Sequence, residues 1–309
     1  MKPIQLGIVG VGKIARDQHI PALTADPSFD IAACVTRHEG VAGAPVFQSI
    51  EEMLDAVPAL DAVSICTPPQ THFAIALAAL RRGKHVLLEK PPCETVGQLE
   101  ALAREAEKGG RTLFQTWHAR YAAGVEPARR WLSERQMTGG RIVWKEDVRL
   151  WHPGQTWLWQ PGGFGVFDPG INALSILSRI VPRDVFVKAA TLYIPANCQT
   201  PIAADLSVTT DDGVEIAAVF DFRHTGTQSW DIEIETERGA LNLSEGGGAL
   251  AIDGNAADLP VTAGEYPALY RRFADLVRER RADVDGTPFR LVADAFAVAR
   301  RVEAEPFHP

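Results

Sequence analysis

A glycine pattern near the N-terminus restricts the folds open to this chain more than any other feature. Residues 6–15 read LGIVGVGKIA, so Gly10, Gly12 and Ala15 form G-x-G-x-x-A between an apolar strand-like run and a helical pattern. In such a motif the first glycine permits a tight turn, the second admits a diphosphate and the small third residue lets the helix pack on the strand. The strand–turn–helix context predicts a dinucleotide site rather than a turn with only a structural role.

Short apolar runs alternate with helical patterns over the first part of the chain. Strands are expected at residues 5–9, 31–35, 62–66, 85–88 and 112–116, and helices at 13–23, 49–57, 71–82 and 95–108. This alternation is typical of parallel strands joined by crossover helices. We therefore predict an α/β chain in which residues 1–120 form an N-terminal Rossmann domain with a doubly wound parallel sheet.

The pattern changes near residue 120, and we expect residues 121–309 to form a C-terminal α+β domain. The expected elements are helices at about 126–135, 169–180, 265–281 and 289–302, a run at 141–150, and strands at 185–193, 203–209, 214–222, 229–236, 239–243 and 249–252. Asp211-Asp212-Gly213 is a strong hairpin signal. This half is predicted to hold a mostly antiparallel open sheet with helices on one face, to bind the substrate and to carry any homo-oligomer contact.

The bulk composition limits the partners of the chain. Its 309 residues carry a net charge of -8 and no long Lys/Arg run, which disfavours nucleic acid and anionic membranes. It has no apolar run long enough to span a bilayer and no signal-peptide pattern at its start. The separated cysteines Cys34, Cys66, Cys93 and Cys198 argue against a zinc site or a disulfide framework. We expect a cytoplasmic protein with a small-molecule partner and no metal.

The end of the second predicted strand bears on the choice of cofactor. An NAD-selective site usually has Asp or Glu there, but this chain has Thr36-Arg37-His38. Because a guanidinium matches phosphate geometry, Arg37 predicts NADP, with NAD as the alternative if Arg37 is only solvated. The Thr67-Pro68-Pro69 turn lies where ligands bind in open α/β sheets, and His72 beyond it is expected at the surface. The predicted cofactor-binding residues are Gly10, Gly12, Lys13, Ile14, Thr36, Arg37, His38, Cys66, Thr67, Pro68, Pro69, His72, Glu89 and Lys90.

Three motifs together resemble the Gfo/Idh/MocA family of glucose–fructose oxidoreductases and inositol dehydrogenases. They are Gly10-Val11-Gly12, Cys66-Thr67-Pro68-Pro69 and Glu89-Lys90-Pro91, and the resemblance covers essentially the whole chain. Residues 144–147, 151–155 and 166–175 are similar to the subgroup of bacterial L-arabinose and D-galactose 1-dehydrogenases. The resemblance implies a Rossmann domain, an open α+β domain and NAD(P)-dependent oxidation of a pyranose C1 to a lactone.

One position departs from many members of that family, which carry Asp-x-x-x-His where this chain has Asp168-x-x-x-Asn172. A histidine base at the second position is therefore excluded, and the arabinose and galactose subgroup also resembles this chain in having Asn there. Positions i and i+4 share a helix face, so both side chains can enter one pocket. The alternative for Asp168 is a helix N-cap.

Oxidation at C1 requires loss of the O1 proton and transfer of a hydride to the nicotinamide. The predicted catalytic residues are Lys90, Asp168 and Asn172. In this hypothesis Asp168 accepts the proton, while Asn172 and Lys90 hold O1 and the ammonium stabilises negative charge there. The roles of Lys90 and Asp168 can be exchanged, and the alternative for Lys90 is an exposed surface lysine.

Sugar-binding candidates follow from the second half of the chain. The predicted substrate-binding residues are Lys90, His118, Glu146, Trp151, His152, Asp168, Asn172 and Trp230. Glu146 and Asp147, taken as strand neighbours, point to opposite faces, and the resemblance favours Glu146. The alternatives are a structural role for His118 and core packing for the tryptophans. The alternative functions for the whole chain are a polyol or inositol-type dehydrogenase of the same family and a non-catalytic dinucleotide-binding sensor.

Overall fold

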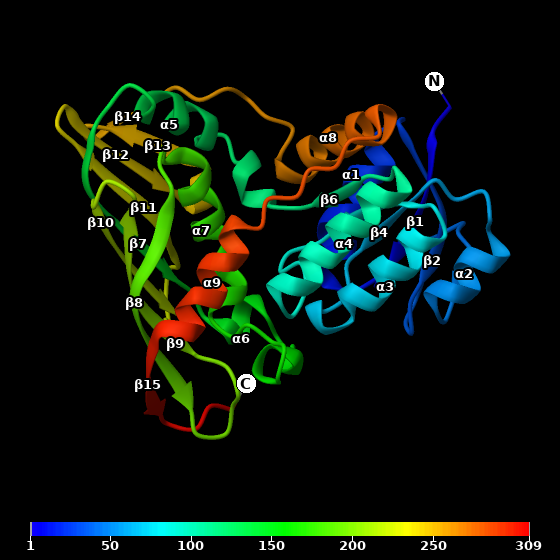
Figure 1. The fold of residues 1–309 in the computed structure, drawn as a ribbon, viewed down its shortest axis with the longest axis horizontal. Coiled ribbons are helices and arrows are strands. Elements are labelled where there is room, and N and C mark those ends of the chain that lie inside the picture. Colours follow the sequence, from blue (N-terminus) through cyan, green and yellow to red (C-terminus); the bar gives the residue numbers. More distant parts are fainter. Residues whose placement is uncertain (1, 309) are drawn as a thin grey trace. The chain divides into compact units, whose positions relative to one another are not determined.

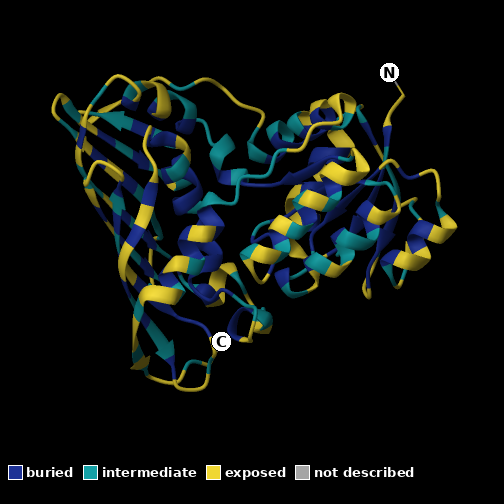
Figure 2. Ribbon diagram, viewed as in Figure 1, coloured by how far each residue is buried: buried dark blue, intermediate teal, exposed yellow. Residues whose placement is uncertain are grey.

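The chain forms two compact units, each built around its own sheet. The computed structural model describes residues 2–308. One unit comprises Met1–Trp117 with Ala263–Gly286, and the other comprises His118–Thr262 with Thr287–Pro309. Figures 1 and 2 show the elements and their burial. Over residues 2–308, no helix is both long enough and apolar enough to cross a membrane.

The first unit contains a six-stranded parallel sheet in the order β3-β2-β1-β4-β5-β6. Its strands are β1 (Ile4–Val9), β2 (Phe29–Val35), β3 (Val46–Phe47), β4 (Ala62–Ile65), β5 (His85–Leu88) and β6 (Leu113–Gln115). Every residue of β4 and β5 is buried, as expected for a parallel sheet covered on both faces. This strand order confirms the predicted doubly wound Rossmann sheet, whose order reverses beside β1.

The helices of the first unit include one irregular segment. They are η1 (Ala15–His19), α1 (Ile20–Ala25), α2 (Ile50–Ala56), α3 (Pro69–Arg81), α4 (Val96–Gly109) and α8 (Glu265–Glu279). The pattern at 13–23 predicts one regular helix, but η1 is a π-helical turn that continues into α1. The Ser49 and Thr95 side chains cap α2 and α4 by accepting backbone N–H groups, which explains why these helices begin where the sequence predicts.

Helix α8 belongs to the first unit although the sequence pattern assigns it to residues 121–309. In Figure 1 it lies beside α1, and the two helices are in contact. Tyr270 packs edge-on against Phe29 at 5.4 Å between ring centroids, and Phe273 stacks with Phe29 and Phe114, each at 6.2 Å. Burial of these aromatic rings, which are distant in sequence, accounts for the return of the chain to this unit.

The second unit contains a nine-stranded sheet in the order β14-β13-β12-β11-β7-β10-β9-β8-β15. The strands are β7 (Met137–Lys145), β8 (Val185–Pro195), β9 (Ala203–Thr210), β10 (Glu215–Asp221), β11 (Ser229–Thr236), β12 (Gly239–Ser244), β13 (Ala249–Ile252), β14 (Asn255–Ala256) and β15 (Ala299–Ala304). Neighbouring strands are antiparallel except at β7–β10 and β8–β15. The predicted, mostly antiparallel sheet is therefore confirmed.

Helices of the second unit cover one face of its sheet. They are η2 (His118–Tyr121), α5 (Val125–Leu132), α6 (Val148–Trp151), η3 (Thr156–Trp159), α7 (Phe167–Ile180), η4 (Glu245–Gly247) and α9 (Thr287–Val298). Strand β10 alternates between buried and more exposed residues, and its buried Phe220 meets Phe167 of α7 at 5.8 Å between ring centroids. Helix α7 thus lies on the buried face of the sheet.

Two expected elements of the second unit differ in the structure. The pattern at 289–302 predicts a helix throughout, but α9 ends at Val298 and residues 299–304 form β15. Pairing with the edge of β8 decides this, and such a contact overrides helix propensity. The run at 141–150 is also divided, because β7 ends at Lys145 and α6 begins at Val148.

Candidate functional site

The glycine loop has the space and backbone geometry that a diphosphate requires. Gly10 has a φ of 90°, which favours glycine, and its N–H donates to the Val35 carbonyl at 2.9 Å. A Cβ on Gly10 would lie 2.7 Å from the Thr67 side chain, whereas a Cβ on Gly12 would meet no atom within 4 Å. The open space at Gly12, at the start of a helix, fits a dinucleotide diphosphate.

The next two predicted residues lie at this helix start. Lys13 and Ile14 are both exposed, and the ammonium of Lys13 pairs with Asp17 one turn later. Both side chains are accessible to a ligand at the glycine loop.

The end of β2 presents a cation rather than a carboxylate. Thr36 is buried and its Oγ1 accepts the His38 N–H at 3.1 Å, while Arg37 and His38 are exposed. Asp30 lies near the opposite end of the strand. This arrangement leaves the Arg37 guanidinium accessible to a ribose phosphate.

The His72 side chain contacts the backbone of the Thr67 turn from inside the protein. Helix α3 begins at Pro69, with Pro68 as the preceding cap residue. His72 is fully buried, with Nε2 2.5 Å from the Thr67 carbonyl and Nδ1 3.1 Å from the Pro92 carbonyl. The expectation of a surface His72 is therefore wrong, and burial lowers the pKa of its ring. His72 supports the turn instead of facing a ligand, while Cys66 before the turn is also buried.

Glu89 and Lys90 follow β5 at the carboxyl edge of the parallel sheet, where ligands bind in such folds. Glu89 is only 3% exposed, and its Oε2 accepts the backbone N–H of Lys90 at 2.6 Å. Lys90 is half-buried. Glu89 therefore acts inside the protein, on the backbone that carries Lys90.

In the second unit, Asp168 and Asn172 lie one turn apart on α7. The helix begins at Phe167 after Val166, so Asp168 is inside the first turn and is not the N-cap residue. Asp168 is 3% exposed, and Oδ1 of Asn172 is buried with no hydrogen-bond partner among residues 2–308. Because leaving such an oxygen unpaired is costly, a ligand hydroxyl that donates to it would be stabilised.

His152 lies between two buried carboxylates. Its Nε2 is 3.1 Å from Oε1 of Glu146, and its Nδ1 is 3.7 Å from Oδ2 of Asp168. The other oxygen of Glu146 accepts the Trp230 Nε1–H at 2.8 Å. We call Glu146, His152, Asp168 and Trp230 the carboxylate–histidine cluster. These four predicted residues come from four separate segments of the unit.

The strand expected for Glu146 and Asp147 ends before both residues. Glu146 is 3% exposed, whereas the Asp147 carboxylate caps α6 and pairs with Arg149 at 2.9 Å. The hydrogen bonds of Arg149 lower the pKa of Asp147. The Glu146 and Asp147 side chains do point in different directions, as predicted. The reason is that Asp147 caps a helix, not that the two residues alternate on a strand.

Of the two remaining predicted residues of this unit, Trp151 contacts the cluster and His118 lies on a turn that is bonded to α7. Trp151 is 37% exposed and meets Trp230 edge-on at 4.9 Å between ring centroids. His118 begins the η2 turn, and Arg120 of that turn donates to the Ser175 carbonyl of α7 at 2.9 Å. Helix α7 therefore anchors the segment that carries His118.

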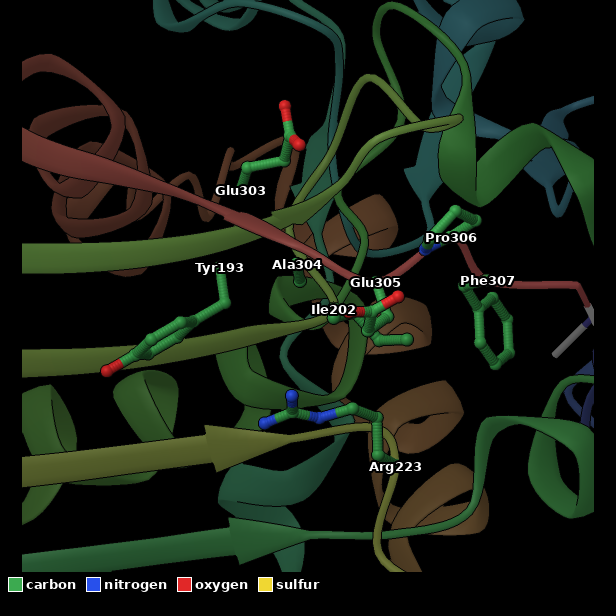
Figure 3. A pocket seen from close by; sticks show the side chains of 8 residues that line it. All are labelled: Tyr193, Ile202, Arg223, Glu303, Ala304, Glu305, Pro306 and Phe307. Atoms are coloured by element: carbon green, nitrogen blue, oxygen red, sulfur yellow. The ribbon is translucent and has the colours of Figure 1, made fainter.

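A separate cavity of about 390 Å³ lies where β8, β10 and β15 end. Figure 3 shows Tyr193, Arg223 and Phe307 around it, and its lining contains no predicted site residue. Phe307 contacts Trp159 at 5.1 Å between ring centroids, and Trp159 contacts Phe222 at 6.0 Å. These aromatic rings stand between the cavity and the carboxylate–histidine cluster, because Phe222 also packs on His152.

One buried group in the first unit escapes prediction from sequence. His19, Tyr266 and Tyr270 are all buried and linked to Glu89 directly or through one another. The one available signal is the spacing of the tyrosines, which places them on one face of a predicted helix. Nothing in the sequence connects that face to His19.

Comparison with known proteins agrees with this architecture. A family model described as "Oxidoreductase family, NAD-binding Rossmann fold" matches residues 4–116. Galactose 1-dehydrogenase of Pseudomonas fluorescens is 46% identical over 308 residues, and the alignment covers 100% of this chain and 100% of that one. The chain belongs to the Gfo/Idh/MocA oxidoreductase family.

Solved structures extend the comparison. D-galactose-1-dehydrogenase from Rhizobium etli is 50% identical, with a TM-score of 0.94 over 100% of this chain and 99% of that one. A 3-ketoreductase from Actinomadura kijaniata, crystallised with NADP and TDP-benzene, has a TM-score of 0.85 at 20% identity over 98% and 99% of the two chains. The second likeness shows the fold alone.

Proposed function

We propose that this oxidoreductase is an NAD(P)-dependent aldose 1-dehydrogenase that oxidises the C1 hydroxyl of D-galactose, L-arabinose or both to the lactone. The carboxylate–histidine cluster carries the proposal, because it groups two buried carboxylates, a histidine between them and an aromatic ring with an unpaired carboxamide oxygen one turn along α7. Such a set suits a ligand with several hydroxyls and an apolar face. The names of the two galactose dehydrogenases to which the chain is similar give independent support.

The proposed roles follow from the chemistry of C1 oxidation. The nicotinamide cofactor, when bound, accepts the C1 hydride. Asp168 accepts the O1 proton, and the carboxamide of Asn172 binds the O1 hydroxyl. The Lys90 ammonium stabilises negative charge on O1, and its role can be exchanged with that of Asp168.

The other residues of the cluster are proposed to bind the sugar. Glu146 and His152 bind ring hydroxyls, Trp151 and Trp230 face the C–H surface of the sugar, and His118 lies at the edge of the pocket. These assignments are supported by the contacts within the second unit.

The proposed cofactor is NADP, with NAD as the alternative. The exposed Arg37 and the lack of Asp or Glu at residues 36–38 support NADP. The glycine loop is proposed to hold the diphosphate, because a Cβ at Gly12 would meet no protein atom within 4 Å.

A substrate panel tests the proposal directly. The purified protein is assayed with D-galactose, L-arabinose, D-glucose and myo-inositol, with NADP or NAD, by absorbance of the reduced nicotinamide, and the product is identified by NMR. D-Galactose and L-arabinose have the same ring stereochemistry from C1 to C4, so both are expected to react. Turnover of the inositol alone would favour the polyol dehydrogenase alternative, and dinucleotide binding without turnover would favour the sensor.

We also propose a homo-oligomer through the open face of the nine-stranded sheet. Val219 of β10 is on the face opposite Phe220 and is paired with Val143 of β7, and Phe186 of β8 is 50% exposed. A mass above that of one chain in multi-angle light scattering, reduced by Val219→Lys, is expected. The four cysteines are free thiols, which fits the proposed cytoplasmic location.

A further inference from the structure

A buried network of polar side chains is hydrogen-bonded to the backbone N–H of Lys90 through Glu89. The Oε1 atom of Glu89 is 2.8 Å from the hydroxyl of Tyr266 and 3.1 Å from Nε2 of His19. Its Oε2 accepts the Lys90 N–H at 2.6 Å. One carboxylate thus joins two side chains from distant parts of the sequence to the backbone of a single residue.

The far side of the network fixes the orientation of His19. Its Nδ1 lies 2.7 Å from the Tyr270 hydroxyl, and that hydroxyl lies 3.0 Å from Oγ of Ser64. His19, Ser64 and Tyr270 are all fully buried. Every polar atom of the imidazole is therefore engaged, so the ring has one orientation toward Glu89.

Burial and the neighbouring polar groups shift the pKa values of the network residues. Burial by itself lowers the pKa of His19, but Cys66, Tyr270 and Glu89 raise it well above its ordinary value. Burial and Glu89 raise the pKa of Tyr266 well above its ordinary value. Both shifts favour the protonated forms of His19 and Tyr266 beside the Glu89 carboxylate, and hydrogen bonds from such donors to a carboxylate are short and strong.

Local structure supplies each member of the network. The π-helical turn η1 ends at His19 and places it in the core, and such turns are frequent at functional sites. Tyr266 and Tyr270 lie one turn apart on α8 and face the same way. Glu89 immediately precedes Lys90 at the carboxyl edge of the sheet.

We infer that Glu89, held by His19 and Tyr266, is a positioning residue for Lys90 in the proposed reaction. The inference rests on the proposed function, because the role of Lys90 belongs to it. The carboxylate fixes the peptide from which the Lys90 side chain projects. Loss of either donor to Glu89 loosens the carboxylate that holds this peptide and displaces the Lys90 ammonium from the position it needs in the transition state.

The test compares Tyr266→Phe and Glu89→Gln with a control, Thr112→Val. Tyr266→Phe removes one donor to Glu89, and Glu89→Gln leaves one acceptor where the network needs two. Thr112 is also fully buried, and its hydroxyl donates to a carbonyl of α8, at Leu276, instead of to Glu89. All three variants lose a buried hydrogen bond in the same unit, and only the control leaves the network intact.

Two measurements separate positioning from a purely structural role. Steady-state kinetics with D-galactose is expected to show kcat lowered about tenfold to a hundredfold in both network variants, since a misplacement of about 1 Å costs on the order of a hundredfold. The KM values for sugar and cofactor stay the same, and Thr112→Val keeps the wild-type kcat. Competitive acetylation with mass spectrometry is expected to show an altered rate at Lys90 in the network variants only.

The outcomes are distinct. Network variants with lower thermal stability but wild-type kcat and wild-type Lys90 acetylation would overturn the inference. If Tyr266→Phe does not fold, the nearly isosteric Glu89→Gln decides on the same two measurements. If the wild-type protein oxidises no aldose, the proposed function fails, and Lys90 acetylation alone then supports or overturns the positioning role.

Discussion

Nδ1 of His152 lies 3.7 Å from a carboxylate oxygen of Asp168, and the opposite nitrogen of the same ring bonds to Glu146. Asp168 lies in the first turn of α7, and His152 is the C-cap residue of α6. The contact ties the loop after β7 to the helix that carries the proposed proton acceptor. It gives Asp168 a fixed position before any substrate is present.

Asp168→Asn is expected to lower kcat by about a hundredfold or more, because it preserves size and removes the group that accepts the proton. The KM for D-galactose is expected to change little. Steady-state kinetics measures both constants, and circular dichroism checks folding. Asp147→Asn is the matched control, because Asp147 is nearby but pairs with Arg149. A kcat near that of the wild type in Asp168→Asn would assign the base to another residue.

Arg37→Ala is expected to lower kcat/KM for NADP by about tenfold to a hundredfold, since loss of one charge-assisted contact with a 2′-phosphate costs on the order of 1.5–3 kcal/mol. The value for NAD should stay unchanged. Arg82→Ala serves as control, because that surface arginine pairs with Asp55 at 2.5 Å in the same unit. An unaltered ratio between the two cofactors would remove Arg37 from the phosphate site.

Gly10→Ala and Gly12→Ala are expected to fail in different ways. A methyl group on Gly10 is strained at a φ of 90° and meets Thr67, so Gly10→Ala lowers the free energy of unfolding by about 1–3 kcal/mol. A methyl group on Gly12 meets no protein atom and should leave stability unchanged, but it occupies the diphosphate space and raises the KM for the cofactor. Chemical denaturation and kinetics measure the two effects, and equal loss of stability in both variants would contradict this account.

His85 makes stability depend on pH. Burial, together with Arg111 and Arg280, lowers its pKa to about 4, and its Nδ1 accepts the Thr112 N–H at 3.0 Å. An unfolded histidine has a pKa of about 6.5, so between about pH 6.5 and about pH 4 only the unfolded state takes up this proton. The free energy of unfolding is therefore expected to decrease as the pH decreases from about 6.5 to about 4. This group accounts for at most about 1.4 kcal/mol per pH unit of that decrease.

The variant His85→Gln isolates that effect. Glutamine can accept the same Thr112 N–H but does not titrate. Denaturant titrations at about pH 7 and about pH 5 should show a smaller difference in the variant than in the wild type. Equal differences would mean that His85 does not contribute, because the other buried histidines are unchanged in the comparison.

Local sequence patterns predict most strands within the sheets, but they do not predict the edge strand β15. The ranges of β5, β11 and β13 coincide with the predicted strands, because each is a short apolar or alternating run bounded by turn residues. Strand β15 escapes prediction because residues 299–304 suit a helix equally well and become a strand only by pairing with β8. The place of α8 likewise depends on packing against rings that are far away in sequence.

The candidate site shows the same limit. Glu146, His152, Asp168 and Trp230 can each be proposed singly, from residue type or from the family resemblance, yet their mutual hydrogen bonds depend on the second sheet being assembled. His19 offers no signal at all, because its partners lie far along the chain and its burial results from a π-helical turn that propensities do not encode.

The return of α8 means that the nucleotide-binding half of this protein is not one continuous stretch of the gene. A fragment that stops after Trp117 lacks both tyrosines that hold His19 and, through Tyr266, Glu89. A chimera that exchanges cofactor modules must therefore transplant residues 263–286 along with the N-terminal part. Recombination at a single crossover would separate the buried His19–Glu89 pair from the two tyrosine hydroxyls that are hydrogen-bonded to it.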